Sequence, residues 1–487
     1  MSTNNQIPDK QIPDIQTPDI QTPDNTTAVE HDADHRAELH EEHDEHGHAD
    51  DHEDGHEDDH ADDHEEHHHH EEEYCPIIGG TPIDAPAVRA QFPFFQEQPG
   101  AIPFNNAATT QVPATVIDTV ANFLRRGTAS PGRGALDKLT TTITSQLESA
   151  RARVAAFIGA QAEDIVFTSG TTASLNLVAL GWGLKNLKNG DEIMVCLEDH
   201  KSTVLPWLNL QRILASFGVQ IKIVPIALHQ MGNYELQSIE KAKTDRTRLL
   251  AMSHVHHVYG LNMEVHEIRA MLGPDVLISL DAAQSVGHRP VNLEKLPVDF
   301  LSFSGHKMFA LSGVGVLWVS PKWRNSLQSP VVGGGMQPEE GEPTLKLPST
   351  SLASLLEAGT PNIPAILSMV PAIDFIENTG MDIIQGRIKE LMKHLYLSLR
   401  ALPGIEFSPG LDHCWHQSHG ILSFRFSNAK TADVAFVLAD ANILVRAGDH
   451  CVFRKDRGDD YLRVSLHVYN TEEEIDRFVA VLSSTLA

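Results

Sequence analysis

The chain has 487 residues and a formal net charge of −29, and most of that charge lies near the N-terminus. Residues Glu30–Glu73 hold 22 of the 66 acidic residues, one basic residue and 14 of the 28 histidines, which leaves a net charge of −8 for the rest. The acidity therefore belongs to one segment and says little about the partners of the remaining chain, for which we expect no nucleic-acid partner.

Four cysteines in so long a chain do not make a disulfide framework, so we expect a reducing compartment, the cytoplasm. The sequence contains no apolar run of about 18 residues, and no charged segment followed by an apolar stretch opens it. We therefore expect neither a membrane span nor a secretory signal.

The first 29 residues carry a pentapeptide repeat, QIPDK, QIPDI, QTPDI and QTPDN, between Gln6 and Asn25. Proline at every fifth position without apolar bulk predicts a disordered linker. The His/Asp/Glu-rich tail of residues 30–73 cannot bury apolar surface, so we expect it to be disordered too.

The imidazoles and carboxylates of this tail are ligands for divalent transition metals. The candidate ligands are His52, His56, His60, His64, His67, His68, His69 and His70. A solvated tail without a metal function, or a purification tag, is the alternative.

From about Val88 onward the chain has the pattern of a folded body. Long helices are expected at Val116–Arg126 and Leu136–Ile158. Apolar runs separated by helical patterns then predict strands at Ile165–Phe167, Glu192–Cys196, Gln220–Val224, Leu249–Ser253, Val276–Leu280, Phe300–Phe303 and Gly315–Val319. This alternation is typical of an α/β fold with a mainly parallel sheet and helices on both faces.

The C-terminal third has a different pattern. A helical stretch over 361–400 precedes three predicted strands, Gly420–Phe426, Ile443–Arg446 and Tyr461–Leu466. Thr471 opens a final helix, and Glu474 three residues later predicts a capping box. We expect a smaller α+β domain at 361–487, a large domain at 111–360, and an N-terminal segment, 74–110, that joins the small domain.

The stretch Val298–Val319 predicts strand, polar turn and strand, with Lys307 in the turn. A lysine at a buried strand end is unfavourable unless it is paired or used covalently. A dehydrated lysine has a lowered pKa and forms a Schiff base with an aldehyde cofactor. A surface turn with an exposed lysine is an equally good interpretation of this stretch alone.

Two other strand ends supply groups that pyridoxal phosphate needs. Asp281 follows an apolar run, and a carboxylate against the pyridine nitrogen keeps that nitrogen protonated. Thr171 and Thr172 open a helix after the strand at 164–169, where backbone N–H groups and hydroxyls can hold a phosphate. On its own such a helix start is usually only an N-cap.

Together these motifs resemble the class V aminotransferase superfamily, and within it the SufS-type cysteine desulfurases, which include selenocysteine lyases. The resemblance runs from about Phe92 to the C-terminus. It implies a fold-type I pyridoxal phosphate enzyme with a mainly parallel seven-stranded sheet in the large domain, a smaller α+β domain, and a homodimer with shared sites.

The resemblance also implies individual roles. Lys307 would bind the cofactor covalently and act as the base at the substrate Cα, and His200 would stack on the cofactor ring. The other implied cofactor contacts are Asp281 at the pyridine nitrogen, Gln284 at the ring hydroxyl, Thr171, Thr172, Ser304 and His306 at the phosphate, and Thr360 at the partner subunit's phosphate.

Cys451 lies in a stretch, Arg446 to Cys451, that resembles the loop carrying the desulfurase nucleophile. Arg446, His450 and Arg454 are expected to lower the pKa of its thiol. A buried, inert cysteine is the alternative.

Two further residues are expected at the substrate. Arg463, on a predicted strand, suits a bidentate grip on a carboxylate, with an exposed edge-strand arginine as the alternative. Asn106 lies in a segment that resembles the family's substrate side.

The chain departs from the family pattern at three places. His257 stands where the family has an asparagine at the cofactor's ring oxygen, although an imidazole can also donate a hydrogen bond. Asp449 replaces a histidine and works against a neighbouring thiolate. Gly132 and Leu136 replace histidines that flank the arginine-glycine pair at Arg133.

The sequence thus predicts a pyridoxal phosphate-dependent cysteine desulfurase that converts L-cysteine to L-alanine and leaves a persulfide on Cys451. A C–S lyase, a selenocysteine lyase and an aminotransferase are alternatives on the same fold, and a metal-buffering protein is an alternative of another class. The expected partners are the amino-acid substrate, a second copy of the chain, a sulfur-acceptor protein and divalent metal at the tail.

Removing residues 1–73 is expected to abolish binding of Zn²⁺ and Ni²⁺ while leaving cofactor content and activity unchanged. Binding to the full chain should weaken as the pH falls through ~6.5, because a protonated imidazole cannot coordinate a metal. Calorimetry with each metal on full-length and truncated protein measures this. Equal stoichiometry in both proteins would place the metal outside the tail, and lost activity would show that catalysis needs the tail.

Overall fold

The computed structural model describes residues 83–131, 136–336, 351–453 and 461–487. The residues from 83 onward belong to one compact unit that extends to the C-terminus. The predictions for the tail, for Arg133 and its neighbours and for Arg454 lie outside the described residues. In the described ranges, no helix combines the length and the apolar character needed to cross a membrane.

The central sheet has the seven predicted strands, and most of them run parallel. These are β2 (Ile165–Thr168), β3 (Glu192–Cys196), β4 (Lys222–Ile226), β5 (Thr247–Ser253), β6 (Leu277–Asp281), β7 (Phe300–Ser304) and β8 (Gly315–Val319). Their spatial order is β2-β8-β7-β6-β5-β3-β4. Only β8 runs against its neighbours β7 and β2. The prediction of a mainly parallel seven-stranded sheet is confirmed.

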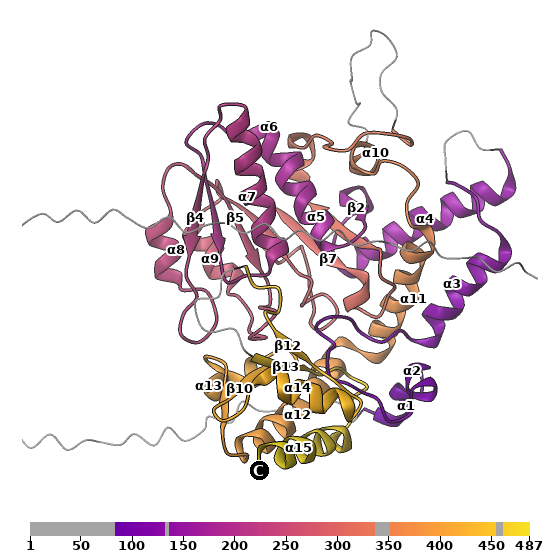
Figure 1. The fold of residues 1–487 in the computed structure, drawn as a ribbon. Coiled ribbons are helices and arrows are strands. Elements are labelled where there is room, and N and C mark those ends of the chain that lie inside the picture. Colours follow the sequence, from indigo (N-terminus) through magenta and orange to yellow (C-terminus); the bar gives the residue numbers. More distant parts are fainter. Residues whose placement is uncertain (1–82, 132–135, 337–350, 454–460) are drawn as a thin grey trace, which may run out of the picture. The chain divides into compact units, whose positions relative to one another are not determined.

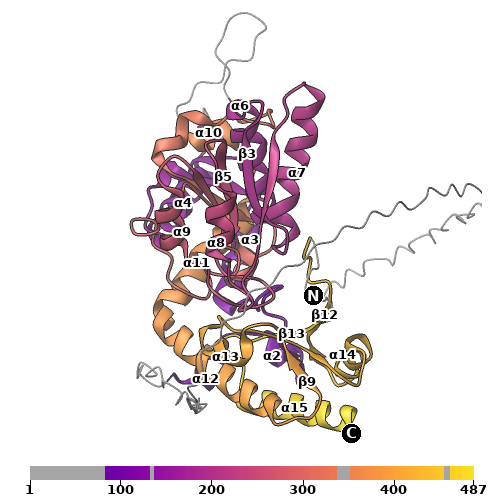
Figure 2. The same ribbon diagram turned by 90° about the vertical axis from the view of Figure 1, so that its left-hand side faces the viewer.

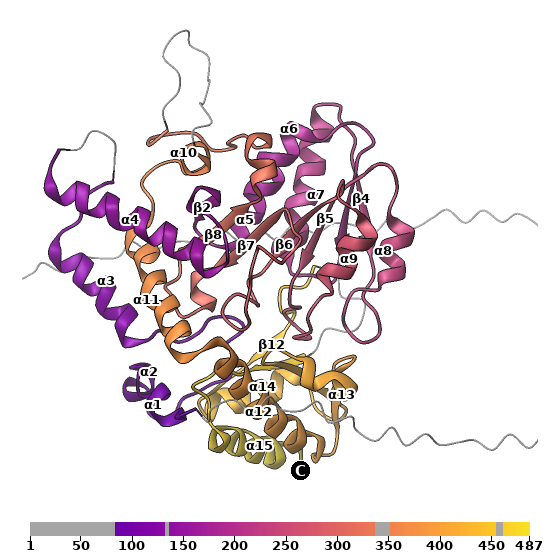
Figure 3. The same ribbon diagram turned by 180° about the vertical axis from the view of Figure 1, so that it is seen from behind.

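Helices cover both faces of this sheet, as the alternating pattern predicts. They are α3 (Ala114–Arg126), α4 (Lys138–Phe157), α5 (Thr171–Val178), α6 (Leu184–Asn186), α7 (Lys201–Ser216), α8 (Leu236–Ala242), α9 (Val265–Leu272), α10 (Leu352–Leu356) and α11 (Ile363–Thr379). In Figure 1, α5, α6 and α7 lie in front of the strands. Figure 3, from behind, shows α4, α9 and α11 in front of them.

The strands are apolar throughout because both of their faces are buried. On β5, Leu249 and Ala251 belong to the apolar cluster on one face, whereas Leu250 and Met252 belong to the cluster on the other. The edge strand β4 lies two residues later than predicted, and most of its residues are only partly buried or exposed. The sequence of β4 therefore gives no clear signal of where the strand begins and ends.

A second sheet of four antiparallel strands forms the core of the C-terminal part. Its strands are β9 (Ile405–Phe407), β10 (Ile421–Phe426), β12 (Arg446–Gly448) and β13 (Tyr461–Ser465), in the order β12-β13-β10-β9. Its helices are α12 (Met381–Arg400), α13 (Leu411–Cys414), α14 (Thr431–Asp440) and α15 (Glu472–Leu486). Figures 1 and 2 show α12 and α15 on one face of this sheet. The predicted smaller α+β layer is present.

The structure corrects several predicted boundaries here. The single helical stretch over 361–400 is two helices, because Gly380 takes a positive φ of 87° between α11 and α12. The predicted strand at 443–446 is two short strands, β11 (Ile443–Leu444) and β12. The sequence analysis predicted neither β9 nor α14. The capping box of Thr471 and Glu474 at the start of α15 is confirmed.

The N-terminal segment connects the two sheets. It contains α1 (Ala85–Arg89), α2 (Phe94–Glu97) and β1 (Ile102–Pro103), and β1 pairs in parallel with β11. Arg89 forms an ion pair with Glu474 of α15 at 2.7 Å. Farther along, the backbone N–H of Thr110 donates to the carbonyl of His306 at 2.9 Å, in the turn after β7. The domain boundaries at 110/111 and 360/361 stay predictions.

Stability should fall between pH 7 and pH 5, because buried histidines are neutral in the fold. Burial lowers the pKa of His254 to about 3, that of His288 to about 4 and that of His467 well below its usual value. In the unfolded chain these side chains titrate near ~6.5, so below that pH the unfolded state binds more protons and gains stability. We expect a loss on the order of 1–2 kcal/mol for each histidine between pH 7 and pH 5.

Urea unfolding at the two pH values measures this loss. Replacing His288 by Gln should flatten the pH dependence, because that variant has one buried neutral histidine fewer. A free energy of unfolding that stays constant or rises between pH 7 and pH 5 would contradict the prediction.

Candidate active site

Four parallel strands bring their carboxyl ends to one edge of the central sheet. His200 follows β3, His257 lies in the loop after β5, Asp281 closes β6 and Lys307 follows β7. Because β3, β5, β6 and β7 are neighbours in the sheet, these four side chains gather at that edge. The sequence analysis had singled out all four.

Lys307 lies in the tight turn Gly305–Lys307 directly after β7. Burial lowers the pKa of its amine to about 8, even though the Asp281 carboxylate works in the opposite direction. The carbonyl of His306, one residue earlier, accepts hydrogen bonds from the backbone and the hydroxyl of Thr110, which brace the turn. A lysine held in this way carries a substantial neutral fraction near neutral pH and can act as a nucleophile or a base.

The carboxylate of Asp281 is held in one orientation. Its Oδ2 accepts from the Thr203 hydroxyl at 3.0 Å, and its Oδ1 accepts from the backbone N–H of Ala283 at 3.0 Å. The residue is 7% exposed. A fixed, buried carboxylate at a strand end is suited to accept a hydrogen bond from a protonated ring nitrogen.

The start of α5 meets the end of β7. The Ser304 hydroxyl accepts from the backbone N–H of Thr171 at 2.8 Å and lies 2.6 Å from the Thr171 hydroxyl. The Thr172 hydroxyl lies 2.7 Å from that of Ser202, at the start of α7. Two helix N-termini thus present hydroxyls and N–H groups together, and such a group can hold a phosphate.

Two imidazoles, those of His200 and His257, lie beside each other at the same edge. His200 caps α7, and its Nδ1 accepts from the backbone N–H of Ser202 at 3.1 Å, so the neutral ring carries its proton on Nε2. Burial lowers the pKa of His200 to about 4, although Asp281 opposes this. The ring of His257 lies 5.0 Å from that of His200, nearly perpendicular to it.

Several buried polar atoms at this edge have no hydrogen-bond partner within the part of the chain that the structure describes. They are both ring nitrogens of His257, Oε1 of Gln284 and Nε of Arg463. A buried polar atom without a partner costs about 1–3 kcal/mol. These atoms, with the amine of Lys307 and the carboxylate of Asp281, therefore fit a polar aldehyde ligand with a protonated ring nitrogen, a ring oxygen and a phosphate, as pyridoxal phosphate has.

Cys451 lies in the loop after β12, and its backbone is attached to the start of α7. Its carbonyl accepts from the N–H of Lys201 at 2.8 Å, and the N–H of Phe453 donates to the carbonyl of Asp199 at 3.3 Å. The guanidinium of Arg446 lies 3.6 Å from the thiol sulfur. The loop of the second sheet thus places this thiol at the same edge as His200.

The expected contribution of His450 to the thiol is corrected by the structure. Its Nε2 donates to the carbonyl of Tyr461 at 2.9 Å, and burial lowers its pKa to about 4, so the ring is neutral. The expected opposing charge of Asp449 is paired with the ammonium of Lys201 at 2.8 Å. Of the expected cations beside the thiol, Arg446 is the one that contacts it in the described residues.

Arg463, on β13, points its guanidinium at this edge and is 3% exposed. It donates to the carbonyl of His257 at 2.8 Å, and its Nη2 lies 3.4 Å from Oδ1 of Asn105. Burial lowers the pKa of Arg463 to about 10, so it remains a cation at neutral pH. The amide of Asn106 instead donates to the carbonyl of Ser465, so Asn105 is the asparagine that contacts Arg463.

Three residues that the sequence analysis placed at the cofactor or at the substrate pocket contact other groups or solvent in this structure. Thr360 is exposed, and its hydroxyl lies 3.4 Å from that of Ser130. Gln284 is buried, and its Nε2 donates to the carbonyl of Ala107 at 2.8 Å. Leu136 is 98% exposed.

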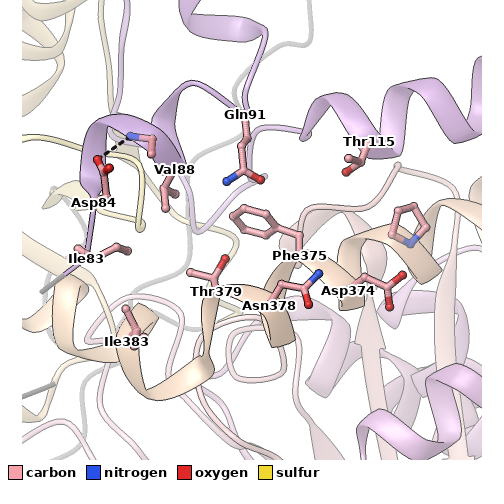
Figure 4. A pocket seen from close by; sticks show the side chains of 12 residues that line it. Ile83, Asp84, Val88, Gln91, Thr115, Asp374, Phe375, Asn378, Thr379 and Ile383 are labelled. Atoms are coloured by element: carbon pink, nitrogen blue, oxygen red, sulfur yellow. Dashed lines mark hydrogen bonds between the residues drawn. The ribbon is translucent and has the colours of Figure 1, made fainter. Parts of the chain in front are cut away.

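A pocket of about 560 Å³ lies elsewhere, between α1, the start of α3 and α11 (Figure 4). Gln91, Thr115, Phe375 and Asn378 are among its lining residues. The lining contains no lysine, histidine or cysteine. Because its lining holds no lysine that could form a Schiff base and no cysteine, this pocket is not the candidate active site.

The family model for Aminotransferase class-V matches residues 102–478, so the chain belongs to the class V aminotransferase family. A cysteine desulfurase from Salmonella agona (strain SL483) is 34% identical over 407 residues, which are 81% of this chain and 97% of that protein. The apo structure of a cysteine desulfurase from Thermococcus onnurineus NA1 matches with a TM-score of 0.76 and 33% identity, covering 84% of this chain and 99% of that one. The Escherichia coli cysteine desulfurase CsdA, in S-sulfonic acid form, matches with a TM-score of 0.73 and 25% identity over 83% and 99%.

The sequence analysis missed three residues of this site. Thr203 orients Asp281, Lys201 contacts the loop of Cys451, and Asn105 contacts Arg463. Each of these contacts joins residues far apart in the sequence. The one sequence signal for Lys201 and Thr203 was that they follow His200 within three residues.

Replacing Gly315 by Ala is expected to weaken cofactor binding at least about tenfold. A Cβ at this position would lie 2.4 Å from the Cα of Gly170, so the start of α5 would have to move away from β8 and with it the N–H of Thr171. Titration of the apoprotein with pyridoxal phosphate, followed by absorption, measures the affinity. Gly386→Ala, where a Cβ meets no atom within 4 Å, is the matched control. Equal affinity in both variants would show that this close approach does not shape the site.

Proposed function

We propose that the protein is a pyridoxal phosphate-dependent cysteine desulfurase that converts L-cysteine to L-alanine and leaves the sulfur as a persulfide on Cys451. The observation that carries this proposal is the meeting of a dehydrated lysine and a thiol at one sheet edge. Lys307 follows β7, and the loop of Cys451 is bonded to the residues after β3 through the N–H of Lys201.

Different residues at this edge would bind the different parts of the cofactor. Asp281 would accept a hydrogen bond from the pyridine nitrogen, His200 would lie against the ring, and Gln284 and His257 would contact the ring oxygen. Thr171, Thr172, Ser304 and His306 would hold the phosphate, with Thr360 supplied by a second subunit. When bound, pyridoxal phosphate withdraws electrons from the substrate Cα and stabilises negative charge there.

Lys307 is the base at the substrate. An amine with a pKa of about 8 is partly neutral at physiological pH and can take the Cα proton, then return it to carbon as alanine forms. Arg463, which keeps its charge, binds the substrate carboxylate from β13 of the second sheet, next to Asn105. These two residues fix the substrate at its amino-acid end.

Cys451 is the nucleophile. Its thiolate attacks the substrate sulfur, the bond between that sulfur and Cβ breaks, and the electron pair remains with Cβ, which takes up a proton. The products are alanine and a persulfide on Cys451. The guanidinium of Arg446 lies 3.6 Å from the sulfur and can donate a hydrogen bond to it during the attack.

The quaternary state, the sulfur acceptor and the compartment belong to this proposal as well. Exposed apolar side chains on and beside α3 and α4 support a homodimer, and they are Ile117, Leu124, Leu136 and Leu139. A persulfide must be passed on, which requires a second thiol from an acceptor protein. The described cysteines are free, which agrees with a reducing compartment such as the cytoplasm.

Replacing Cys451 by Ser should abolish persulfide formation and reduce alanine release by at least ~10²-fold, while the absorption of lysine-bound cofactor stays unchanged. Incubation with L-cysteine, with alanine, pyruvate and sulfide measured together, tests this. Lys307→Ala is the companion variant and should lose both the absorption and the activity. Alanine release by Cys451→Ser at the parent rate would favour a selenocysteine lyase type of reaction, and pyruvate as the main product would favour a C–S lyase or an aminotransferase.

A further inference from the structure

The backbone of the Cys451 loop is held in an uncommon conformation. His450 and Cys451 have φ values of 44° and 62°, in the left-handed region that side chains with a Cβ rarely adopt. Such a conformation persists only where surrounding contacts hold it. The contacts of this loop therefore decide where the thiol lies.

Lys201 and Asp449 together hold both peptide groups of Cys451. The backbone N–H of Lys201 donates to the Cys451 carbonyl at 2.8 Å, and Oδ1 of Asp449 accepts from the Cys451 N–H at 3.0 Å. The other carboxylate oxygen of Asp449 accepts from the Lys201 ammonium at 2.8 Å. One residue from the start of α7 and one from the loop after β12 thus fix the backbone that carries the nucleophile.

The loop has other attachments that act on neighbouring residues. The N–H of Phe453 donates to the carbonyl of Asp199 at 3.3 Å, which together with the bond from Lys201 to Cys451 forms the bridge between His200 and Val452, and the N–H of Val452 donates to the carbonyl of Asp449 at 2.9 Å. These bonds involve backbone atoms only and survive any side-chain change. The ion pair is therefore the part of the attachment that a substitution can remove selectively.

The charges of Lys201 and Asp449 also affect the Cys451 thiolate. A carboxylate two residues from a thiolate disfavours that thiolate, and an ammonium bonded to the carboxylate offsets the repulsion. The side chains of Lys201 and Asp449 are 40% and 41% exposed, so solvent and salt screen the pair. Its effect on the reaction is therefore moderate and depends on ionic strength.

We propose that Lys201 and Asp449 are a positioning pair that fastens the Cys451 loop to the start of α7 and compensates the carboxylate beside the thiol. This inference rests on the proposed desulfurase function. The pair joins the start of α7, at the edge of the central sheet, to the loop of the second sheet that carries Cys451. Lys201 acts through Asp449 and not on the substrate itself.

Four proteins in a double-mutant cycle test the pair: the parent, Lys201→Met, Asp449→Asn and the double variant. The asparagine keeps an oxygen for the Cys451 N–H but carries no charge. Two quantities are measured on the cofactor-loaded protein, namely the pH profile of Cys451 alkylation by iodoacetamide and the rate of persulfide formation from L-cysteine. Lys222→Met, which removes an exposed lysine paired with Glu192 on β3, is the matched control.

Lys201→Met alone should move the alkylation profile to higher pH and slow persulfide formation by about two- to fivefold. Asp449→Asn leaves the Lys201 ammonium unpaired and should move the alkylation profile to a slightly lower pH, whereas the double variant, which has neither charge, should stay near the parent. The deficit of Lys201→Met should shrink in 1 M salt, because salt screens the uncompensated carboxylate. Lys222→Met should behave like the parent.

Two results would overturn the proposal. An equal deficit of Lys201→Met with and without Asp449 would show that the lysine acts on the substrate or cofactor directly. An unchanged alkylation profile in Lys201→Met would show that the pair does not affect the thiol. The alkylation arm needs no turnover, so it still tests the pair if the parent forms no persulfide, a result that would count against the desulfurase function alone.

Discussion

The parallel arrangement of β3, β5, β6 and β7 is the constraint on which the site depends. Parallel neighbours end at the same edge, so residues that follow different strands become neighbours in space although they are far apart in sequence. His200, Asp281 and Lys307 meet only for this reason. The antiparallel strand β8 adds a different contribution, because Gly315 lets the start of α5 approach closely enough for Thr171 to reach Ser304.

Desolvation by burial sets the pKa values of Lys307 and His200 at this edge. Burial makes the amine of Lys307 easier to deprotonate and keeps His200 neutral, whereas Asp281 is supplied with two hydrogen bonds that hold its orientation. Arg463 keeps its positive charge at neutral pH because burial lowers its pKa only to about 10. The site thus combines one fixed anion, one fixed cation and groups that can exchange a proton.

The sequence predicted the parts whose signal is local. Apolar strands buried on both faces give continuous runs, and Lys307 and Asp281 stand directly after two of them, so the strands and these residues followed from the pattern. Long-range contacts such as that between Lys201 and Asp449 left no local signal. In the C-terminal part, β9 has only partly buried or exposed residues and α14 buries few, so neither gave a clear period. The break at Gly380 was hidden because helical patterns continue on both sides of it.

The pairing of β1 with β11 has a consequence for synthesis on the ribosome. Ile102 is translated long before Ile443, so β1 has no strand partner until the second sheet is being made. The residues that follow β1 also brace the turn of Lys307, which emerges between these two times. The central sheet has all its strands by residue 319, long before β11 emerges, so it can form first, whereas the N-terminal segment docks last. Assembly of the catalytic edge is therefore coupled to synthesis of the second sheet, which supplies β11.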